Sequence, residues 1–443
     1  MNVIWLIFVI AVGACVGSFL NVVIYRLPRG ESIVFPGSHC PACGRAIRWF
    51  DNIPLVSWFV LRGRCRQCKA AISPRYVIIE AATALRVAGL FACYYLLRLR
   101  AGAGEFEDSW PMFAAHAALL CGLLACSVVD LEHFEIPLEV MWVCSLVGVV
   151  AAAAGPGRNP FLRTVQPSTI AVGLAAAAGL VVSVILLRRG FLQPSFLDAE
   201  EPPPAPPRKD QKPQTKPGQE AKGKPDSPPV QKRKRGPLPA FLQIPLGTVT
   251  SALFAYVPGD QPPPEDSRNV ALTKEHGVNP RKEILWEVAF LLPPLALAGA
   301  VGLLLDRVPA VRIWWHDLLS AREHPLLAPH LVGLGSALWG YLIGGLWVWA
   351  TRILGTLAFN KEAMGMGDVH ILAAVGAVCG WIVPSLTFFA APFIGLGWAL
   401  YQWIGRRQGV VAYGPYLATG CLAVMVLYDP IVLRVRLLLT GGL

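Results

Sequence analysis

Charged residues are scarce in this chain of 443 residues, at 15% against 54% hydrophobic residues. That balance excludes an ordinary soluble globular protein and predicts a polytopic membrane protein. The 39 Lys and Arg residues outnumber the 28 Asp and Glu residues, which gives a formal net charge of +11. Because the basic residues lie in loops between apolar runs, we expect contact with anionic membrane lipid and no nucleic-acid partner.

Apolar runs of about 18–25 residues can cross a bilayer as helices. Such runs lie near 2–23, 77–97, 112–129, 137–155, 168–187, 284–305, 331–355, 369–384, 385–404 and 410–428. The sequence therefore predicts an all-α polytopic membrane protein with about 8–10 transmembrane helices. No Lys or Arg precedes the first run and no small-residue cleavage site follows it, so we expect a retained anchor.

The first polar loop, 25–76, sets the orientation. It carries nine Lys or Arg residues against Glu31 and Asp51, which predicts a cytoplasmic location. Counting spans from this loop brings Asp130 and Asp368 to the same, cytoplasmic side of an inner membrane. Four arginines would fall on the other side and oppose this assignment: Arg98, Arg100, Arg312 and Arg434.

The composition divides the chain into five parts. A first transmembrane helix (1–24) precedes a cytoplasmic module (25–76), and two membrane regions (77–189 and 284–443) flank an insertion rich in Pro and Lys (190–283). The insertion cannot bury enough apolar surface to fold, so we predict a mostly disordered cytoplasmic segment. Within it, the basic run 232–235 favours contact with the membrane surface, and 241–257 predicts a small ordered element.

Cysteines do not form a disulfide framework, because seven of the 11 are scattered through apolar runs. The other four, Cys40, Cys43, Cys65 and Cys68, form two CxxC knuckles about 21 residues apart. Four thiolates on two tight turns match the tetrahedral geometry of structural zinc. A disulfide is the less favoured alternative in a cytoplasmic loop. We therefore predict a small zinc-knuckle domain, with the metal supplying its folding energy.

Acids are rare at the ends of the apolar runs, and two of them stand out. The run 114–129 ends on Asp130, and Gly365-Met366-Gly367-Asp368 lies between two other runs. A carboxylate there needs water, a partner or a proton. Two neighbouring carboxyl groups share one proton, so one can activate a water while the other donates a hydrogen bond to a carbonyl. Gly365 and Gly367 would allow close approach of the backbone.

This pattern predicts the active site of an aspartic-type membrane peptidase, although each acid alone has a simpler explanation. Asp368 could cap the helix that begins after it, and Asp130 could be an interfacial polar residue. His370 lies near the site as a local polar partner or as a proton carrier. Three glutamates after Asp130 could attract a basic peptide or form a solvated turn: Glu132, Glu135 and Glu139.

At this point the sequence resembles the type IV prepilin peptidases, membrane aspartic proteases of the GxGD class. The resemblance lies in GSFLNVVIYRLP at 17–28, the two knuckles, WFDNIP at 49–54, and SPRY at 73–76 with Glu80. It continues in VDL at 129–131, Ile136-Pro137, MGMGDV at 364–369 and YGPY at 413–416.

The resemblance implies a prepilin peptidase of type IV pilus or type II secretion systems. Members of this family cut the basic leader from prepilins or pseudopilins at the cytoplasmic face, with Asp130 and Asp368 here in the place of the catalytic pair. Many then methylate the new N-terminus with S-adenosylmethionine, a function associated with the cysteine-bearing loop. No glycine-rich nucleotide loop identifies where S-adenosylmethionine would bind.

Three features depart from the family pattern. His370 stands where Lys is usual, Glu132 stands where Asp is common, and the two aspartates are 238 positions apart. The insertion is expected to add two spans, which would leave both acids on one face. The alternatives are a peptidase without methyltransferase activity, a zinc-dependent scaffold and a proton-coupled transporter, which would need deep acids in several spans and an internal repeat.

Overall fold

The computed structural model describes residues 2–100, 102–154, 162, 165–193, 195, 280–404 and 412–440. Every regular element in these ranges is a helix. The longer helices are α1 (Asn2–Arg26), α3 (Arg75–Phe91), α4 (Phe106–His133), α5 (Leu138–Ala154), α6 (Pro167–Arg188), α9 (Pro280–Arg307), α11 (Ala328–Phe359), α12 (Met366–Cys379), α13 (Ile382–Ile404), α14 (Gly414–Val426) and α15 (Tyr428–Thr440). The shorter ones are η1 (Leu27–Arg29), η2 (Trp49–Asn52), α2 (Val56–Val60), the π-helical turn η3 (Ala92–Leu96) and α10 (Pro309–Leu318). The all-α prediction is confirmed.

Each of the ten predicted spans contains a helix. Within the described residues, six are long and apolar enough to cross a membrane: α1, α3 with η3, α4, α6, α9 and α11. Three apolar helices are shorter, namely α5, α12 and the first part of α13. The last predicted span, 410–428, contains α14. Helix α15 follows it directly, and the chain bends by 82° between the two helices.

One helix differs from the expected bounds at both ends. The span expected at 369–384 begins at Met366 and ends at Cys379, where Gly380 has a φ of 74° and terminates the helix. Pro384, the last residue of the expected span, therefore lies in the first turn of α13, where its missing N–H costs nothing. Hydropathy did not predict the helices α10 and α15, because both carry arginines among their apolar residues.

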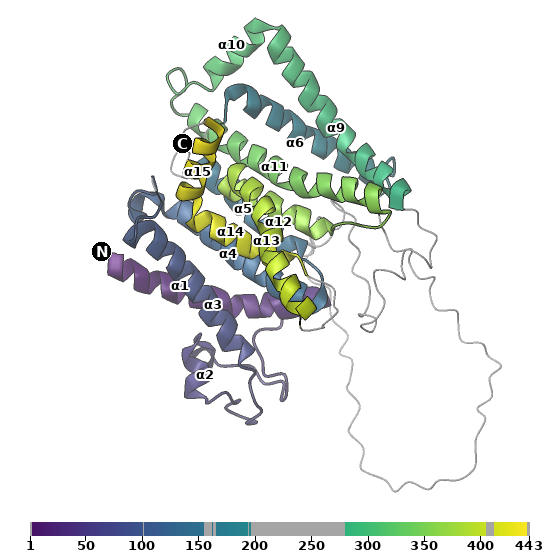
Figure 1. Ribbon diagram of the computed structural model, residues 1–443. Coiled ribbons are helices and arrows are strands. Elements are labelled where there is room, and N and C mark those ends of the chain that lie inside the picture. Colours follow the sequence, from purple (N-terminus) through teal and green to yellow (C-terminus); the bar gives the residue numbers. More distant parts are fainter. Residues whose placement is uncertain are drawn as a thin grey trace, which may run out of the picture.

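Helix α12 forms the centre of the bundle. It packs against α11 and α5 most extensively, and also against α13, α4 and α14, as Figure 1 shows. Every residue from Asp368 to Cys379 is buried. An apolar run without a polar stripe suits this position, because all of its faces meet other helices.

Glycines allow α11 and α12 to approach closely. A Cβ on Gly376 would lie 1.9 Å from the carbonyl oxygen of Gly340, and a Cβ on Gly344 would lie 2.1 Å from that of Leu372. Small residues at such interfaces gain van der Waals contact that larger residues would prevent. This contact fixes the position of α12 against α11.

Two helix pairs flank the centre on opposite sides in Figure 1. One is α1 with α3, which carries the cysteine-bearing module between them, and the other is α6 with α9. Gly179 of α6 lies so close to α9 that a Cβ would be 2.3 Å from the Cα of Pro294. Most of the insertion, including 232–235 and the element expected at 241–257, lies outside the described residues.

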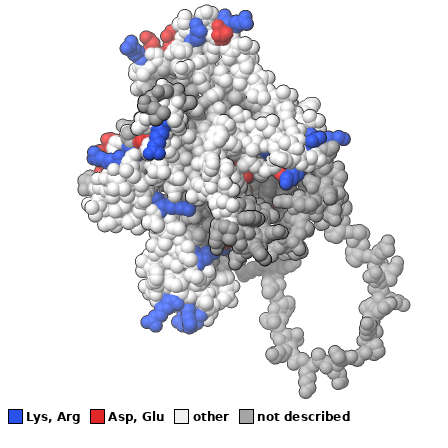
Figure 2. Space-filling view, in the orientation of Figure 1, with Lys and Arg blue, Asp and Glu red and all other residues white. Residues whose placement is uncertain are grey.

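Two of the arginines that opposed the predicted orientation are paired with acids. Arg98 pairs with Glu105 at 3.0 Å, and buried Arg100 pairs with Asp429 at 2.6 Å. The other two, Arg312 and Arg434, lie exposed on α10 and α15. Figure 2 shows that most of the visible surface between the top of the molecule and the cysteine-bearing module is uncharged.

The glycine contact between α11 and α12 predicts the effect of adding one methyl group. Gly376→Ala should lower the stability of the detergent-solubilised protein by about 1–3 kcal/mol, because the new Cβ meets backbone atoms. Gly299→Ala in α9 is the control, since nothing lies within 4 Å of a Cβ there. Equal melting temperatures of the two variants in a thermal unfolding assay would contradict this packing.

Candidate active site

Asp130 lies in the last turn of α4. The helix ends at His133 because Phe134 adopts a left-handed conformation (φ 56°), with its N–H donating to the Asp130 carbonyl at 2.9 Å. Asp130 is 6% exposed. Its Oδ2 accepts a hydrogen bond of 2.9 Å from the backbone N–H of Gly414, at the start of α14. The acid is therefore buried with a specific donor.

Asp368 lies in the first turn of α12. Gly365 precedes the helix in an extended conformation, and Asp368 is 6% exposed. Its Oδ1 is buried and has no hydrogen-bond partner in the part of the chain that the structure describes. An unpaired buried oxygen is costly unless a proton, a water or a ligand satisfies it. The group is thus placed to take part in chemistry.

The two acids come together at one end of the bundle although 238 positions separate them. Asp130 lies at the C-terminal end of α4 and Asp368 at the N-terminal end of α12, and these two helices pack against each other. Gly414 lies between their helices: a Cβ there would be 2.7 Å from Oδ2 of Asp130 and 3.5 Å from Cδ1 of Ile371 on α12. The close packing of α4, α12 and α14 therefore brings the two motifs to one site.

The two glycines of the GMGD stretch have different roles. A Cβ on Gly367 would lie 2.7 Å from Cβ of Ile136, so only glycine fits where the loop after α4 meets α12. A Cβ on Gly365 would meet only Asp368 Oδ2, at 3.7 Å, and its φ of −70° suits any residue. Close approach therefore explains Gly367 and does not explain Gly365.

His370 faces a different side of α12. Residues two positions apart do not share a helix face, and the His370 ring lies 5.7 Å from that of Trp142 on α5. The residue is 5% exposed. Its position is that of a buried group in the interface between α12 and α5, which does not favour a role as proton carrier.

The glutamates after Asp130 are partly neutralised. Glu132 pairs with Arg75 of α3 at 2.9 Å, and both side chains are 38% exposed. Glu135 is exposed and Glu139 lies in the first turn of α5. The end of the bundle that holds the two aspartates is therefore bordered by exposed acids and by the module between α1 and α3.

Sequence reasoning missed two contributors to the site. Gly414 was noted only through the resemblance, and Arg352, which is 2% exposed on α11, was not singled out. Arg352 donates a hydrogen bond to the carbonyl of Met364, directly before the GMGD stretch. A lone arginine in an apolar run is the signal that could have identified it.

The four knuckle cysteines form one cluster. Their Sγ atoms lie within 4.8 Å of one another, and those of Cys40 and Cys68 are 3.8 Å apart. A tetrahedral zinc with Zn–S bonds of about 2.3 Å requires sulfurs about 3.8 Å apart. Backbone N–H groups of Cys68 and Gln67 point at Cys65 and lower the pKa of its thiol to about 6. These residues fit a zinc ion, which needs thiolates.

The two knuckles have matching backbones. The N–H of residue 44 donates to the carbonyl of Cys40 at 2.8 Å, and the N–H of residue 69 donates to that of Cys65 at 3.1 Å. Both residues have positive φ values, 68° at Gly44 and 58° at Lys69. The repeated turn directs all four thiols to one point, which a pair of unrelated loops would not do.

Polar contacts tie the module together and to the membrane helices. Asp51 and Arg66 form two-pronged hydrogen bonds, and the hydrogen bond and charge of Arg66 lower the pKa of Asp51. Buried Glu80 of α3 accepts a bond of 2.7 Å from the N–H of Leu55, which itself has a φ of 62°. The module is therefore anchored at the same end of the bundle as the start of α3.

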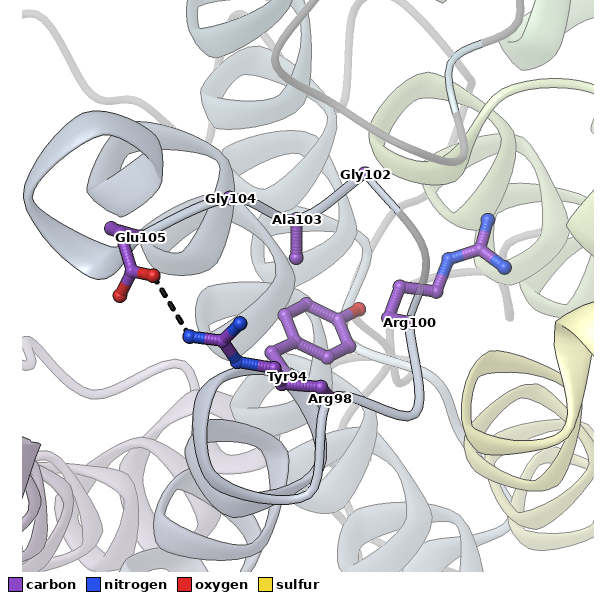
Figure 3. A pocket seen from close by; sticks show the side chains of 7 residues that line it. All are labelled: Tyr94, Arg98, Arg100, Gly102, Ala103, Gly104 and Glu105. Carbon is purple, nitrogen blue, oxygen red and sulfur yellow. Dashed lines mark hydrogen bonds and ion pairs between the residues drawn. The ribbon is translucent and has the colours of Figure 1, made fainter.

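A separate cavity of about 240 Å³ lies at the other end of α4. Its lining residues are Tyr94, Arg98, Arg100, Gly102, Ala103, Gly104 and Glu105. Figure 3 shows Arg98 directed at Glu105, and Arg100 directed away from that pair. Asp130 lies about 36 Å further along α4, at 1.5 Å per residue, so this cavity is not part of the carboxylate site.

Two family models match the chain. The bacterial peptidase A24 N-terminal domain matches residues 11–94, which include the four cysteines and Glu80. The type IV leader peptidase family matches residues 303–400, which include Asp368 and exclude Asp130. The intervening stretch, 95–302, holds α6 and most of α9 and is matched by neither model.

Curated relatives match part of the chain. The chain is 42% identical over 156 residues to a prepilin leader peptidase/N-methyltransferase of Myxococcus xanthus, covering 35% of this chain and 42% of the relative. It is 39% identical over 203 residues to a type 4 prepilin-like proteins leader peptide-processing enzyme of Escherichia coli, covering 41% and 68%. A prepilin leader peptidase/N-methyltransferase of Pseudomonas aeruginosa is 37% identical over 161 residues, covering 30% and 51%.

The chain thus spans about half the length of the Myxococcus xanthus and Pseudomonas aeruginosa relatives, and 68% of the Escherichia coli relative. No solved structure matches it significantly.

The cysteine cluster predicts one zinc ion per chain. Purified protein should contain stoichiometric zinc by elemental mass spectrometry, and Cys40→Ser or Cys68→Ser should lower that content severalfold, because each change removes a quarter of the ligands. Cys15→Ser, at an exposed position on α1, is the control. Full zinc content after all four knuckle changes would refute the site.

Proposed function

This chain belongs to the type IV leader peptidase family, and we propose that it cleaves the basic leader peptide from type IV prepilins or pseudopilins. The observation that carries the proposal is the meeting of Asp130 and Asp368, both buried, at one end of the helix bundle. The named activity of the Escherichia coli relative, which the chain matches over 68% of that protein, supports it.

The chemistry is that of a carboxyl pair that shares one proton. The ionised carboxyl takes a proton from a water, whose oxygen attacks the scissile carbonyl carbon. The protonated carboxyl donates a hydrogen bond and then its proton to the carbonyl oxygen, which gives a tetrahedral diol. Collapse of the diol breaks the C–N bond, and the amine leaves with a proton from the first carboxyl. No metal takes part, and the pair titrates as a unit.

Each carboxyl is supported differently for this task. The Gly414 N–H holds one oxygen of Asp130 in a fixed direction, while Oδ1 of Asp368 has no partner in the described residues. A fixed carboxyl beside one with an open oxygen leaves a place for water or the scissile carbonyl. The exposed acids at this end, Glu135 among them, would attract a basic leader.

The location and a second activity are part of the proposal. We propose that the aspartates face the cytoplasm across the inner membrane, since the loop 25–76 carries most of the basic residues near the first two helices. Methylation of the new N-terminus with S-adenosylmethionine would follow cleavage, as the names of the Myxococcus xanthus and Pseudomonas aeruginosa relatives suggest. The cysteine module would hold structural zinc for this purpose.

Removing either carboxylate should abolish cleavage. Asp130→Asn and Asp368→Asn keep the shape of each side chain but cannot share or transfer the proton. Purified variants incubated with a prepilin and labelled S-adenosylmethionine should release less than about a thousandth of the wild-type product, in line with loss of a general acid or base.

Mass spectrometry of the product's N-terminus measures cleavage and methylation together. The wild type should yield a shortened N-terminus that carries a methyl group. A shortened but unmethylated product would indicate a peptidase without methyltransferase activity. Normal cleavage by either Asn variant would remove the peptidase assignment.

The contact between Gly414 and Asp130 predicts a milder defect. In Gly414→Ala the new Cβ would lie 2.7 Å from Oδ2, so the carboxyl must move. A displacement of about 1 Å can lower a rate about 100-fold. Gly420→Ala on the same helix is the control, because its nearest neighbours lie at 3.6 Å. Equal cleavage rates for the two variants would show that Gly414 does not orient Asp130.

A further inference from the structure

Arg352 is a fully buried cation in the interior of α11. Its side chain is 2% exposed, and an isolated charge there would be very costly. Three acceptors satisfy it: Glu287 Oε1 at 2.8 Å, Glu362 Oε1 at 2.5 Å, and the backbone carbonyl of Met364. The planar guanidinium therefore links α11 to Glu287 on one side and to residues 362–364 on the other in a fixed geometry.

Glu287 is the buried partner, and it comes from α9. Its side chain is 2% exposed. Oε1 also accepts from Ser195 Oγ at 3.0 Å, and Oε2 accepts from Trp349 Nε1 at 3.0 Å. Both carboxylate oxygens thus have donors, so the carboxylate is held in one orientation and holds Arg352 in turn. Glu287 lies outside the residues that either family model matches.

The other acceptors belong to the loop 360–365, which connects α11 to α12. The same loop lies on the last turns of α11, where Ala363 N–H donates to Thr356 Oγ1 at 3.2 Å. A Cβ on Gly355 would be 2.6 Å from Cβ of Ala363. Asp368 follows Met364 by four residues, so the position of this loop determines where α12 begins and where the Asp368 carboxyl lies.

We propose that Arg352, held by Glu287 of α9, is a positioning residue that fixes the loop 360–365 and thereby orients Asp368 toward Asp130. The inference rests on the proposed peptidase function and adds to it. It gives the pair α6 and α9 a part in the active site, because one of its residues secures the loop that precedes the GMGD stretch.

A purely structural role for the ion pair makes a different prediction. Removing one partner of a buried pair leaves an uncompensated charge and destabilises the fold, whereas removing both is often nearly neutral. If the pair only held α9 against α11, the double change would restore both stability and activity. If Arg352 positions the loop, the double change restores stability and leaves catalysis slow.

The experiment compares Arg352→Met, Arg352→Met with Glu287→Met, and Arg352→Lys in the full-length protein. Melting temperature is measured in detergent, and kcat and KM are measured with a prepilin. The double variant should melt near the wild type, with kcat about 100-fold lower and KM within about threefold, because the loop and not the substrate contact is lost. Arg352→Lys keeps the charge but not the three-way geometry, so its kcat should fall about tenfold.

Arg312→Met, at an exposed position on α10, is the matched control and should keep wild-type kcat. Wild-type kcat in the double variant or in Arg352→Lys would overturn the proposal. If the double variant fails to fold, the kcat of Arg352→Lys alone tests the proposal. A wild-type protein that does not cleave prepilins would instead overturn the proposed function, so the two failures are distinguishable.

Discussion

A carboxyl group at the edge of the hydrocarbon layer requires a hydrogen bond, a proton or a charged partner. The structure depends on how this requirement is met at Asp130 and Asp368. Asp130 takes the N–H of Gly414 from α14, and Asp368 lies at the start of the fully buried helix α12. Gly414 and Gly367 permit the close contacts that bring α14 and the loop after α4 against these acids. The central bundle of α4, α5, α11, α12 and α14 holds this arrangement.

The separation of the two acids in sequence has a simple physical resolution. Helices α6 and α9 pack against each other and against α11, at the side of the bundle and away from α1 and α3. A pair of antiparallel spans returns the chain to the face from which it left, so the second acid reaches the same end as the first. The Glu287–Arg352 ion pair joins this added pair to the loop before Asp368.

Much of the fold could be predicted from hydropathy, because each apolar run became a helix. Helix boundaries were less predictable. Helix α12 begins at Met366, three residues before the apolar run 369–384, and it ends at Cys379, before Gly380, and not at Pro384. The two carboxyls and the four thiols are recognisable from residue type and spacing alone. The roles of Gly414 and Ile136 are not, because they arise from contacts between segments that are remote in sequence. Glu287 and Arg352 carried one signal, a charge inside an apolar run.

The proximity of Asp130 and Asp368 can be measured directly by cross-linking. In a variant with Cys at both positions and a protease site engineered between them, a short bifunctional thiol reagent should keep the two fragments joined after proteolysis. A matched variant with Cys at positions 130 and 429 should fall apart, because Asp429 pairs with Arg100 beside the cavity at the other end of α4. Fragments that separate in the first variant, or remain joined equally in both, would contradict the carboxyl pair.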